Sequence, residues 1–521
     1  MRAKTRLQFL GGVAGVNLTG SCYLLEIEQG KRRTKILIDI GLVQCGFRDS
    51  LEKNQAILQE IDPKKIDFII LTHSHIDHVG RLPLLAKYGF AGRIICTEGT
   101  RYLIRAMLDD SAKIQMNEAG YNNARALKDS HSQKNKGCSR DLLTRGNFDR
   151  IKRKNKKQNG KAHHQPLYGM EDVETVDGLI KNGGFEYYEW IRLTHGISLK
   201  FYPSGHVMGG GIVVIKLESE PKDIQICFSG DLGRNDGVIL PPPELVDEEI
   251  DYLILESTYG GKRHPDQKEE VKKMLDLVKR AAKNDRKIII PSFALERVQE
   301  MIYRLSCYMQ EGEIPVVPIF LDSPLAAKIT SAFSKGWRQG MFVDQERLAF
   351  NPFDPEENPY FQIVSGVEES NALIAKAGKH IIIAGSGMCD AGRIRGYLRA
   401  NLSKASTIVA LVGYMVEGSL GRKLKDGLPS VRMSDEEIIV QAEIISFESF
   451  SAHADGAFLA AYAQSVIMNN NTDGNRKIFL VHGEGESALN LKADIENSLP
   501  ENLSKKVKIM IPKINQKEEI I

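Results

Sequence analysis

The chain is poor in cysteine: it has seven among 521 residues, and no two of them form a CxxC pair. Disulfide-held secreted folds and zinc ribbons both need paired or closely spaced cysteines. The pattern therefore argues against both classes and favours buried, reduced thiols. The seven are Cys22, Cys45, Cys96, Cys138, Cys227, Cys307 and Cys389.

Long apolar runs and a strong net charge are also missing. No apolar segment approaches the roughly 20 residues that cross a membrane, and the N-terminal MRAKTRLQFLGGVAG is too broken by glycine for a signal peptide. The 70 basic and 67 acidic residues leave a formal net charge of +3, so bulk charge neither favours nor excludes a polyanionic partner. We expect a cytoplasmic protein with no membrane contact.

Apolar runs rich in isoleucine and valine recur, and several are followed by a short turn and then by a helical pattern. In KIIIPSFALERVQEMIYRL, for example, Val298, Met301, Ile302 and Leu305 stand at helical spacing after a β-branched run. This alternation predicts an α/β fold, and the length favours roughly two to four domains. The predicted strands are Ile66–Leu71, Ile224–Phe228, Tyr252–Glu256, Lys287–Ile290, Val316–Leu321, His380–Ala384 and Lys477–Val481.

Three of only 12 histidines stand beside an aspartate in HSHIDH, directly after an apolar run. Imidazole nitrogen and carboxylate oxygen are good zinc ligands. If a strand ends at Thr72, His73 and His75 can point the same way across a loop, whereas Asp77 and His78 lie where a helix should start. The segment therefore predicts ligands for two neighbouring metals.

Three further candidate ligands each follow an apolar strand and stand beside glycine. They are His206 in PSGHVMGG, Asp231 in CFSGDLGRND and His482 in FLVHGEG. Taken singly, such a residue is more often part of a turn than a ligand. Because strand ends line the crevice where α/β folds bind ligands, their shared context predicts that they converge.

These motifs, in this order, resemble those of the β-CASP group of metallo-β-lactamase-fold nucleases. Asp39 in ILIDIG matches the first motif, HSHIDH the second, His206 the third and Asp231 the fourth. The chain looks like a bacterial or archaeal relative of the nuclease subunit of the cleavage and polyadenylation specificity factor. The resemblance implies a metallo-β-lactamase αββα sandwich with an inserted α/β β-CASP domain. It places the sandwich at residues 1–258 and 431–521, and the insertion at 259–430, with its end between 380 and 430.

The resemblance also implies two zinc ions per chain. Asp39 would fix the loop and a histidine tautomer without binding metal. The implied ligands are His73, His75 and His206 for one ion, Asp77, His78 and His482 for the other, and Asp231 as the bridge.

Two more segments resemble β-CASP motifs: ESTYGG (256–261) resembles motif A, and SFSAHAD (449–455) resembles motif B. Phosphodiester cleavage expels an alkoxide that benefits from a proton donor. A carboxylate beside a histidine holds its tautomer and raises its pKa, so Glu256 and His453 are the expected pair, with His453 as the general acid. A purely structural Glu–His pair is the alternative. His482 matches motif C, where histidine goes with RNA-directed members of the family and valine with DNA-repair members.

The insertion holds candidate phosphate contacts. SGMCDAGR (386–393) puts Ser386 and Gly387 at a strand–helix turn, where backbone NH groups favour phosphate. Many bacterial members carry histidines soon after this GR; here the sequence is IRGYL, which leaves Tyr397 as a residue that could stack on a base. Arginines with the geometry for bidentate phosphate contacts are Arg393, Arg297 and Arg422.

A basic run, RIKRKNKKQNGK, covers residues 150–161. Such a run is usually a solvated loop, and contact with RNA is the alternative.

The resemblance implies a hydrolase that cuts single-stranded RNA through attack by metal-bound hydroxide, with His453 as acid. Endonucleolytic cleavage is expected; 5′→3′ exonuclease activity and assembly as a homodimer stay open. The same metal pair could instead hydrolyse DNA or a small ester or thioester, and an inactive RNA-binding scaffold is a further alternative. The complete ligand set counts against a scaffold, and the insertion with motifs B and C favours RNA.

Overall fold

The structure, a computed structural model, describes residues 4–15, 17–44, 47–132, 164–180, 184–413, 415–469 and 476–520. The basic run at 150–161 lies outside the described residues. Within the described ranges, every helix is too short or too polar to cross a bilayer.

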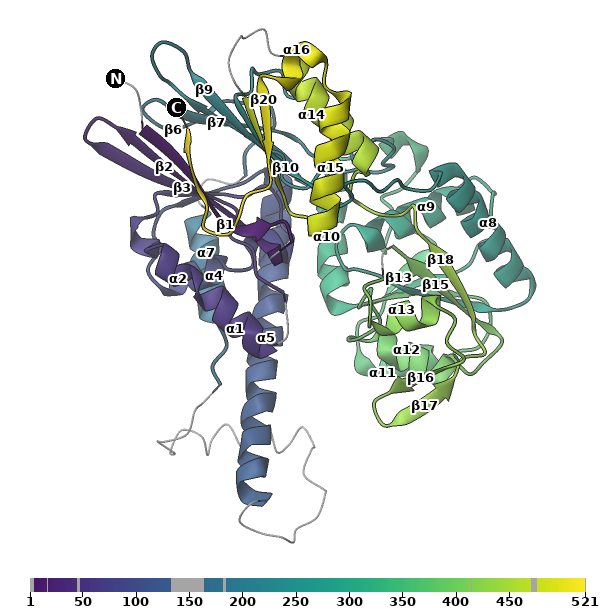
Figure 1. The fold of residues 1–521 in the computed structure, drawn as a ribbon. Coiled ribbons are helices and arrows are strands. Elements are labelled where there is room, and N and C mark those ends of the chain that lie inside the picture. Colours follow the sequence, from purple (N-terminus) through teal and green to yellow (C-terminus); the bar gives the residue numbers. More distant parts are fainter. Residues whose placement is uncertain are drawn as a thin grey trace.

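Two sheets pack face to face in the first lobe (Figure 1). One has the order β21-β1-β2-β3-β4-β5 and the other β20-β19-β10-β9-β8-β7-β6. Aromatic contacts join them: the ring centroids of Phe9 and Phe479 lie 5.1 Å apart, and those of Tyr23 and Phe228 lie 5.9 Å apart. The strands are β1 (Lys4–Val13), β2 (Asn17–Gln29), β3 (Arg32–Ile38), β4 (Phe68–Ile70), β5 (Arg93–Ile95), β6 (Ile191–Thr194), β7 (Ile197–Pro203), β8 (Gly211–Leu217), β9 (Ile224–Phe228), β10 (Tyr252–Glu256), β19 (Arg476–Val481), β20 (Val507–Met510) and β21 (Lys517–Ile520).

Helices cover the outer face of each sheet. Leu24 and Ile69 of the first sheet pack with Leu108 of α5, and Leu253 of the second packs with Leu459 of α14. This layering is the expected αββα sandwich. The long helix α5 extends away from the lobe (Figure 1). The helices of this lobe are α1 (Phe47–Gln55), α2 (Ile57–Glu60), α3 (Ile76–Val79), α4 (Leu82–Lys87), α5 (Glu98–Ser132), α7 (Met170–Leu179), α14 (Gly456–Met468), α15 (Gly485–Ser498) and α16 (Glu501–Ser504).

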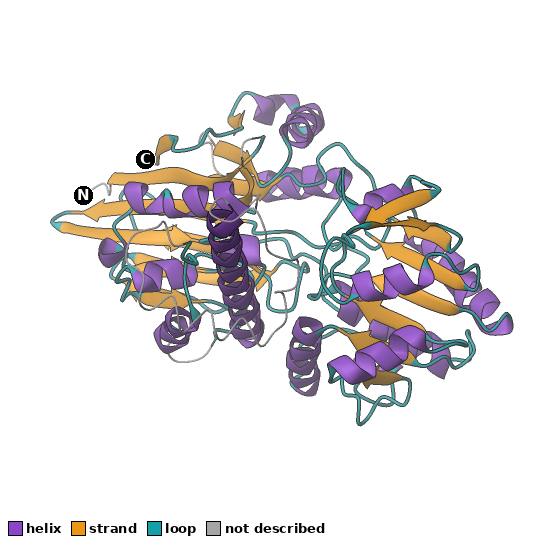
Figure 2. Ribbon diagram, turned by 90° about the horizontal axis from the view of Figure 1, so that it is seen from below, coloured by secondary structure: helices purple, strands orange, loops and turns teal. Residues whose placement is uncertain are grey.

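The second lobe, seen apart from the first in Figure 2, is built on a parallel sheet of order β13-β12-β14-β11-β15-β18. Its inner strands KIIIP, IIIA and TIVALV are buried throughout, because helices cover both faces of the sheet. The strands are β11 (Lys287–Pro291), β12 (Ile319–Asp322), β13 (Phe361–Ile363), β14 (Ile381–Ala384), β15 (Thr407–Val412) and β18 (Glu443–Phe447), with a hairpin of β16 (Ser430–Met433) and β17 (Glu436–Ile439). The helices are α8 (Gln267–Lys283), α9 (Arg297–Gln310), α10 (Pro324–Arg338), α11 (Val367–Ala375), α12 (Ile394–Asn401) and α13 (Leu420–Lys425).

The inserted sheet continues beyond residue 430, where the insertion was expected to end. Strand β18 pairs in parallel with β15 from Ile408–Glu443 to Val412–Phe447. We propose that the insertion ends after Phe447. Only Phe447 of EIISF is buried in this edge strand. A strand with so little burial needs no alternating apolar pattern, so the sequence did not predict it.

A hydrophobic cluster joins the two lobes. It contains Leu103 of α5 and Met208 from the first lobe, and Leu295, Phe333 and Phe342 from the second. Met208 follows His206 by two positions, so the second lobe packs against the loop that carries this candidate ligand.

Candidate metal centre

The HSHIDH segment forms a loop and a short helix after β4. His75 is the N-cap residue of α3, which places Asp77 and His78 in the first helical turn, as the sequence predicts. The ILIDIG loop packs against this turn: a Cβ on Gly41 would lie 1.5 Å from the carbonyl oxygen of Asp77. Only glycine fits there without moving the candidate ligands.

Asp39 holds the loop from behind. Its Oδ1 accepts a hydrogen bond from the Thr72 amide (2.8 Å), and its Oδ2 accepts one from the Thr72 hydroxyl (2.8 Å). The same Oδ2 lies 2.7 Å from Nδ1 of His78. A proton on Nδ1 of His78 is therefore shared with Asp39, which leaves Nε2 of His78 as the nitrogen free for a metal.

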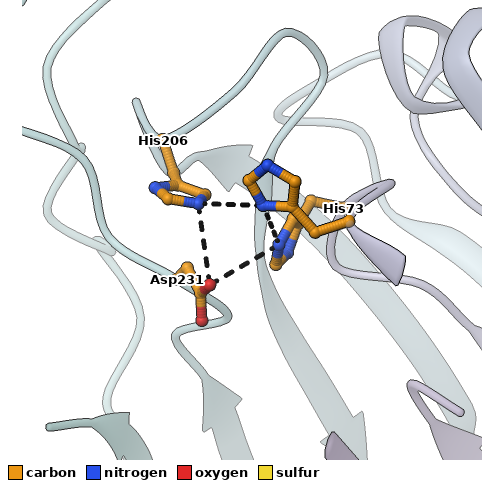
Figure 3. A group of neighbouring side chains, drawn as sticks. His73, His206 and Asp231 are labelled. Carbon is orange, nitrogen blue, oxygen red and sulfur yellow. Dashed lines mark hydrogen bonds and ion pairs between the residues drawn. The ribbon is translucent and has the colours of Figure 1, made fainter. Parts of the chain in front are cut away.

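The first donor cluster brings together residues from three loops (Figure 3). Nδ1 of His75 lies 3.1 Å from Nε2 of His73 and 3.2 Å from Nε2 of His206. Oδ2 of Asp231 lies 3.6 Å from each of those two Nε2 atoms. Four donor atoms thus converge within 4.8 Å of one another.

The second donor cluster contains Asp77, His78 and His482. Nε2 of His482 lies 3.4 Å from Nε2 of His78 and 3.4 Å from Oδ2 of Asp77. Oδ1 of Asp231 faces this cluster, 3.4 Å from Nε2 of His78 and 3.3 Å from Nδ1 of His482. Asp231 therefore lies between the clusters, with one oxygen toward each.

Asp231 also shows that the residues fit metal ions. Its Oδ1 is buried and has no hydrogen-bond partner within the described part of the chain. A buried carboxylate oxygen without a donor is costly, and a cation between imidazole nitrogens and carboxylates removes that cost. Nitrogen and oxygen donors together suit zinc and other divalent transition metals.

The protonation states of the histidines are also consistent with metal binding. Burial, reinforced by the neighbouring imidazoles, holds the pKa of His73 and His206 well below its usual range, and burial lowers the pKa of His75 to about 4. These rings are neutral and offer lone pairs. Burial alone would lower the pKa of His482, but the carboxylates of Asp231 and Asp77 outweigh it and raise that pKa to about 10. A metal bound at the second cluster would displace this proton.

A Glu–His pair lies beside the clusters. Oε1 of Glu256 accepts from the Leu232 amide (2.7 Å) and lies 3.4 Å from Nδ1 of His453. The His453 ring is 4.4 Å, centroid to centroid, from that of His206. Burial lowers the pKa of His453, but Glu256 and Asp231 outweigh it, so the pKa is raised. With Nδ1 facing Glu256, Nε2 is the nitrogen left for a substrate.

Three side chains hold the His453 loop through its backbone carbonyls. Arg234 donates to the carbonyl of Ser449 (2.6 Å), Nδ1 of His206 lies 3.3 Å from that of Ala452, and Nε2 of His264 lies 3.0 Å from that of His453. Sequence reasoning missed Arg234 and His264. The available signal was their place in GDLGR and ESTYGGKRH, three residues after Asp231 and eight residues after Glu256.

His264 is expected to position His453. His264→Ala removes the donor to the His453 carbonyl, and the resulting misplacement of His453 should lower kcat by roughly 10–100-fold with KM little changed. His264→Gln, which keeps a side-chain N–H, should recover most of this loss. Steady-state kinetics and metal analysis of both variants test the role. Equal losses in the two variants, or metal loss in either, would instead indicate a structural residue.

The candidate phosphate-binding residues lie in the second lobe. Ser386 and Gly387 follow β14, in the predicted turn before α12. Each arginine is engaged by a carboxylate: Arg393 by Asp322, Arg297 by Glu300 (2.7 Å) and Arg422 by Asp426 (2.8 Å). Arg297 is also buried, so its ion pair with Glu300 is structural and its guanidinium is not available to a phosphate. Contact of Arg422 and Arg393, which are both partly buried, with phosphate stays a prediction.

Tyr397 does not serve as a stacking surface. Its side chain is fully buried, and its hydroxyl donates to Oδ2 of Asp322 (2.6 Å). The prediction that it stacks on a base is wrong, because the helical spacing of IRGYL turns this residue into the core of the second lobe.

Comparison with family models gives three adjoining matches. The metallo-beta-lactamase superfamily matches residues 16–292, more than half of the chain, the Beta-Casp domain matches 298–424, and the Zn-dependent metallo-hydrolase RNA specificity domain matches 437–510. The chain belongs to the β-CASP family of the metallo-β-lactamase superfamily. The resemblance and the fold class expected from the sequence are thereby confirmed, and membership makes the protein a metallo-hydrolase.

Several relatives of this β-CASP protein match along nearly its whole length. Ribonuclease TTHA0252 of Thermus thermophilus is 31% identical over 482 residues, which cover 92% of this chain and 93% of that protein. An RNase J-like protein of Methanocaldococcus jannaschii is 25% identical, with 95% and 96% covered. Cleavage and polyadenylation specificity factor subunit 3-I of Arabidopsis thaliana is 25% identical, with 96% of this chain and 62% of that protein covered.

Proposed function

We propose that this β-CASP protein is a ribonuclease that hydrolyses phosphodiester bonds of single-stranded RNA with two zinc ions. The observation that carries the proposal is a paired proton donor, His453 with Glu256, beside two donor clusters that share Asp231. The match to an RNA specificity domain and the ribonuclease and RNase J-like names of the relatives support RNA as substrate.

The residues divide the work of the reaction. His73, His75 and His206 would hold one ion, Asp77, His78 and His482 the other, and Asp231 both. Two zinc ions, when bound, supply a water of lowered pKa and a clamp for the scissile phosphate. Asp39 fixes the tautomer of His78 throughout. His453 gives its Nε2 proton to the leaving 3′ oxygen, and Glu256 stabilises the imidazolium until that transfer.

The depth of the site supports a single strand. His73, His78 and His206 are each at most 2% exposed, so a phosphate must reach below the protein surface to contact them. A flexible single strand can bring one phosphate to that depth, whereas a stiff duplex cannot. His482, which matches the motif C histidine of RNA-directed members, favours RNA over DNA.

Digestion of end-labelled oligonucleotides tests the proposal. One sequence is supplied as 5′-phosphorylated RNA, 5′-hydroxyl RNA and DNA, to zinc-loaded and to chelator-treated protein. We expect zinc-dependent cleavage of RNA into internal fragments; mononucleotides released from the 5′ end would add the exonucleolytic mode. Faster cleavage of DNA, or hydrolysis of a thioester without cleavage of RNA, would overturn the proposal.

A further inference from the structure

Phe293 is an aromatic side chain that the second lobe leaves open. It follows β11, whose residues are all buried, yet it is 48% exposed. A single exposed apolar residue is ordinary in itself. The residues around Phe293 are what indicate a binding role.

The ring of Phe293 rests with one face on Gly387. A Cβ on Gly387 would lie 2.8, 2.9 and 3.1 Å from the ring atoms Cδ2, Cε2 and Cγ. Near-equal distances to three consecutive ring atoms mean that the glycine approaches the face of the ring, because an approach in the ring plane would leave the outer two atoms clearly farther away. One face is therefore supported by backbone, and the exposed area belongs to the opposite face and the rim.

The loop that supports this ring has small and polar neighbours. Gly385, two residues before Gly387, has the Ser323 hydroxyl 3.4 Å and the Ser292 carbonyl 3.8 Å from the position of an added Cβ. Loops after β11, β12 and β14 thus meet here. A flat aromatic face among hydroxyl and backbone groups suits a nucleotide, with its flat base and polar sugar-phosphate. A protein partner would favour a larger continuous apolar area.

The ring also lies on the edge of the sheet that leads to the metal centre. Strands β14, β11, β15 and β18 are neighbours in that order and run parallel, so their carboxyl ends share one edge. Strand β18 leads to the loop of His453, two strand spacings or about 10 Å from β11. Leu295, two residues after Phe293, packs in the cluster that joins the lobes together with Met208, which lies two residues after His206.

We propose that Phe293 is a stacking platform for one nucleobase of the RNA strand, supported from behind by Gly387. The inference rests on the proposed ribonuclease function and adds a binding site for a base near the scissile phosphate. Stacking on an aromatic side chain accepts any base, because every base has a flat π-face. The site therefore contributes affinity and position, not sequence selection.

An abasic scan tests the proposal. RNAs with a single abasic position, moved one nucleotide at a time, are given to the wild type, Phe293→Ala and Phe293→Trp. We expect one abasic position to lower kcat/KM of the wild type and of Phe293→Trp by roughly 5–150-fold. Phe293→Ala should show the same loss of kcat/KM on intact RNA, and the abasic substitution at that position should cause it no further loss.

Two controls separate this site from the chemistry. Hydrolysis of bis(4-nitrophenyl) phosphate should be equal in the wild type and Phe293→Ala, and Tyr88→Ala, which removes an aromatic residue of similar exposure (45%) at the end of α4, should cleave RNA like the wild type. An abasic penalty that is the same in Phe293→Ala and the wild type would overturn the proposal. If the wild type cleaves no RNA, the proposed function fails, and the stacking is then tested by binding. Equal Kd values for intact and abasic RNA in the wild type and in Phe293→Ala would overturn the stacking.

Discussion

His453→Ala is expected to lower kcat for RNA by about 10²–10⁴-fold, the usual contribution of a general acid, and to leave both donor clusters able to bind metal. His453 belongs to neither cluster among the described residues. Its Nδ1 faces Glu256, and its ring is tilted against that of His206, with the ring centroids 4.4 Å apart. Removing it takes away the proton donor without removing a ligand.

Two measurements make this result specific. A phosphodiester with a 4-nitrophenolate leaving group needs little protonation, so His453→Ala should hydrolyse it at close to the wild-type rate. The pH profile provides the second. The acid acts while protonated, and its pKa is raised by Glu256 and Asp231 against burial, so the wild-type rate should fall as pH rises through that raised pKa. This alkaline fall should vanish in the variant.

Metal analysis excludes the main alternative. If His453→Ala loses metal and loses activity equally on RNA and on the activated substrate, His453 supports the metal centre and is not the acid. Full cleavage of RNA by the variant would remove the acid role altogether.

Most of the candidate site residues could be predicted from the sequence because they stand at the ends of apolar runs that are easy to recognise. Asp231, Glu256 and His482 lie at or just after the carboxyl ends of β9, β10 and β19, which are parallel neighbours and so end at one edge of the second sheet. His73 follows β4 of the first sheet. The seven predicted strands are all present, with ends shifted by no more than three residues. At these strands, the secondary structure that the local sequence pattern predicts is the one that the fold contains.

Other features depend on tertiary contacts that a local pattern does not contain. Strand β18 is mostly half-buried and so lacks a clear apolar alternation. From the sequence, Tyr397 is a possible stacking residue, but the packing of α12 buries it against Asp322. His264 acts on a backbone carbonyl 189 positions away, and no spacing rule along the chain connects the two.

Asp231→Asn is expected to abolish cleavage, because Asp231 faces both clusters. Among the described residues it is the carboxylate whose two oxygens lie 3.3–3.6 Å from ring nitrogens of both groups. The amide removes one oxygen donor and the shared negative charge. We expect metal affinity to fall by more than about 100-fold, beyond the loss seen when a residue supporting a ligand is removed, and cleavage to fall to the level of chelator-treated wild type.

Asp223→Asn is the matched control, since it removes the same charge from a half-exposed carboxylate paired with Lys216 at 2.9 Å. It should retain full metal content and activity. Metal analysis by mass spectrometry, chelator competition and thermal unfolding compare the variants, and Asp231→Asn should unfold like the metal-free wild type. If Asp231→Asn instead binds both ions with wild-type affinity, the carboxylate does not bridge, and the orphaned Oδ1 requires a different partner.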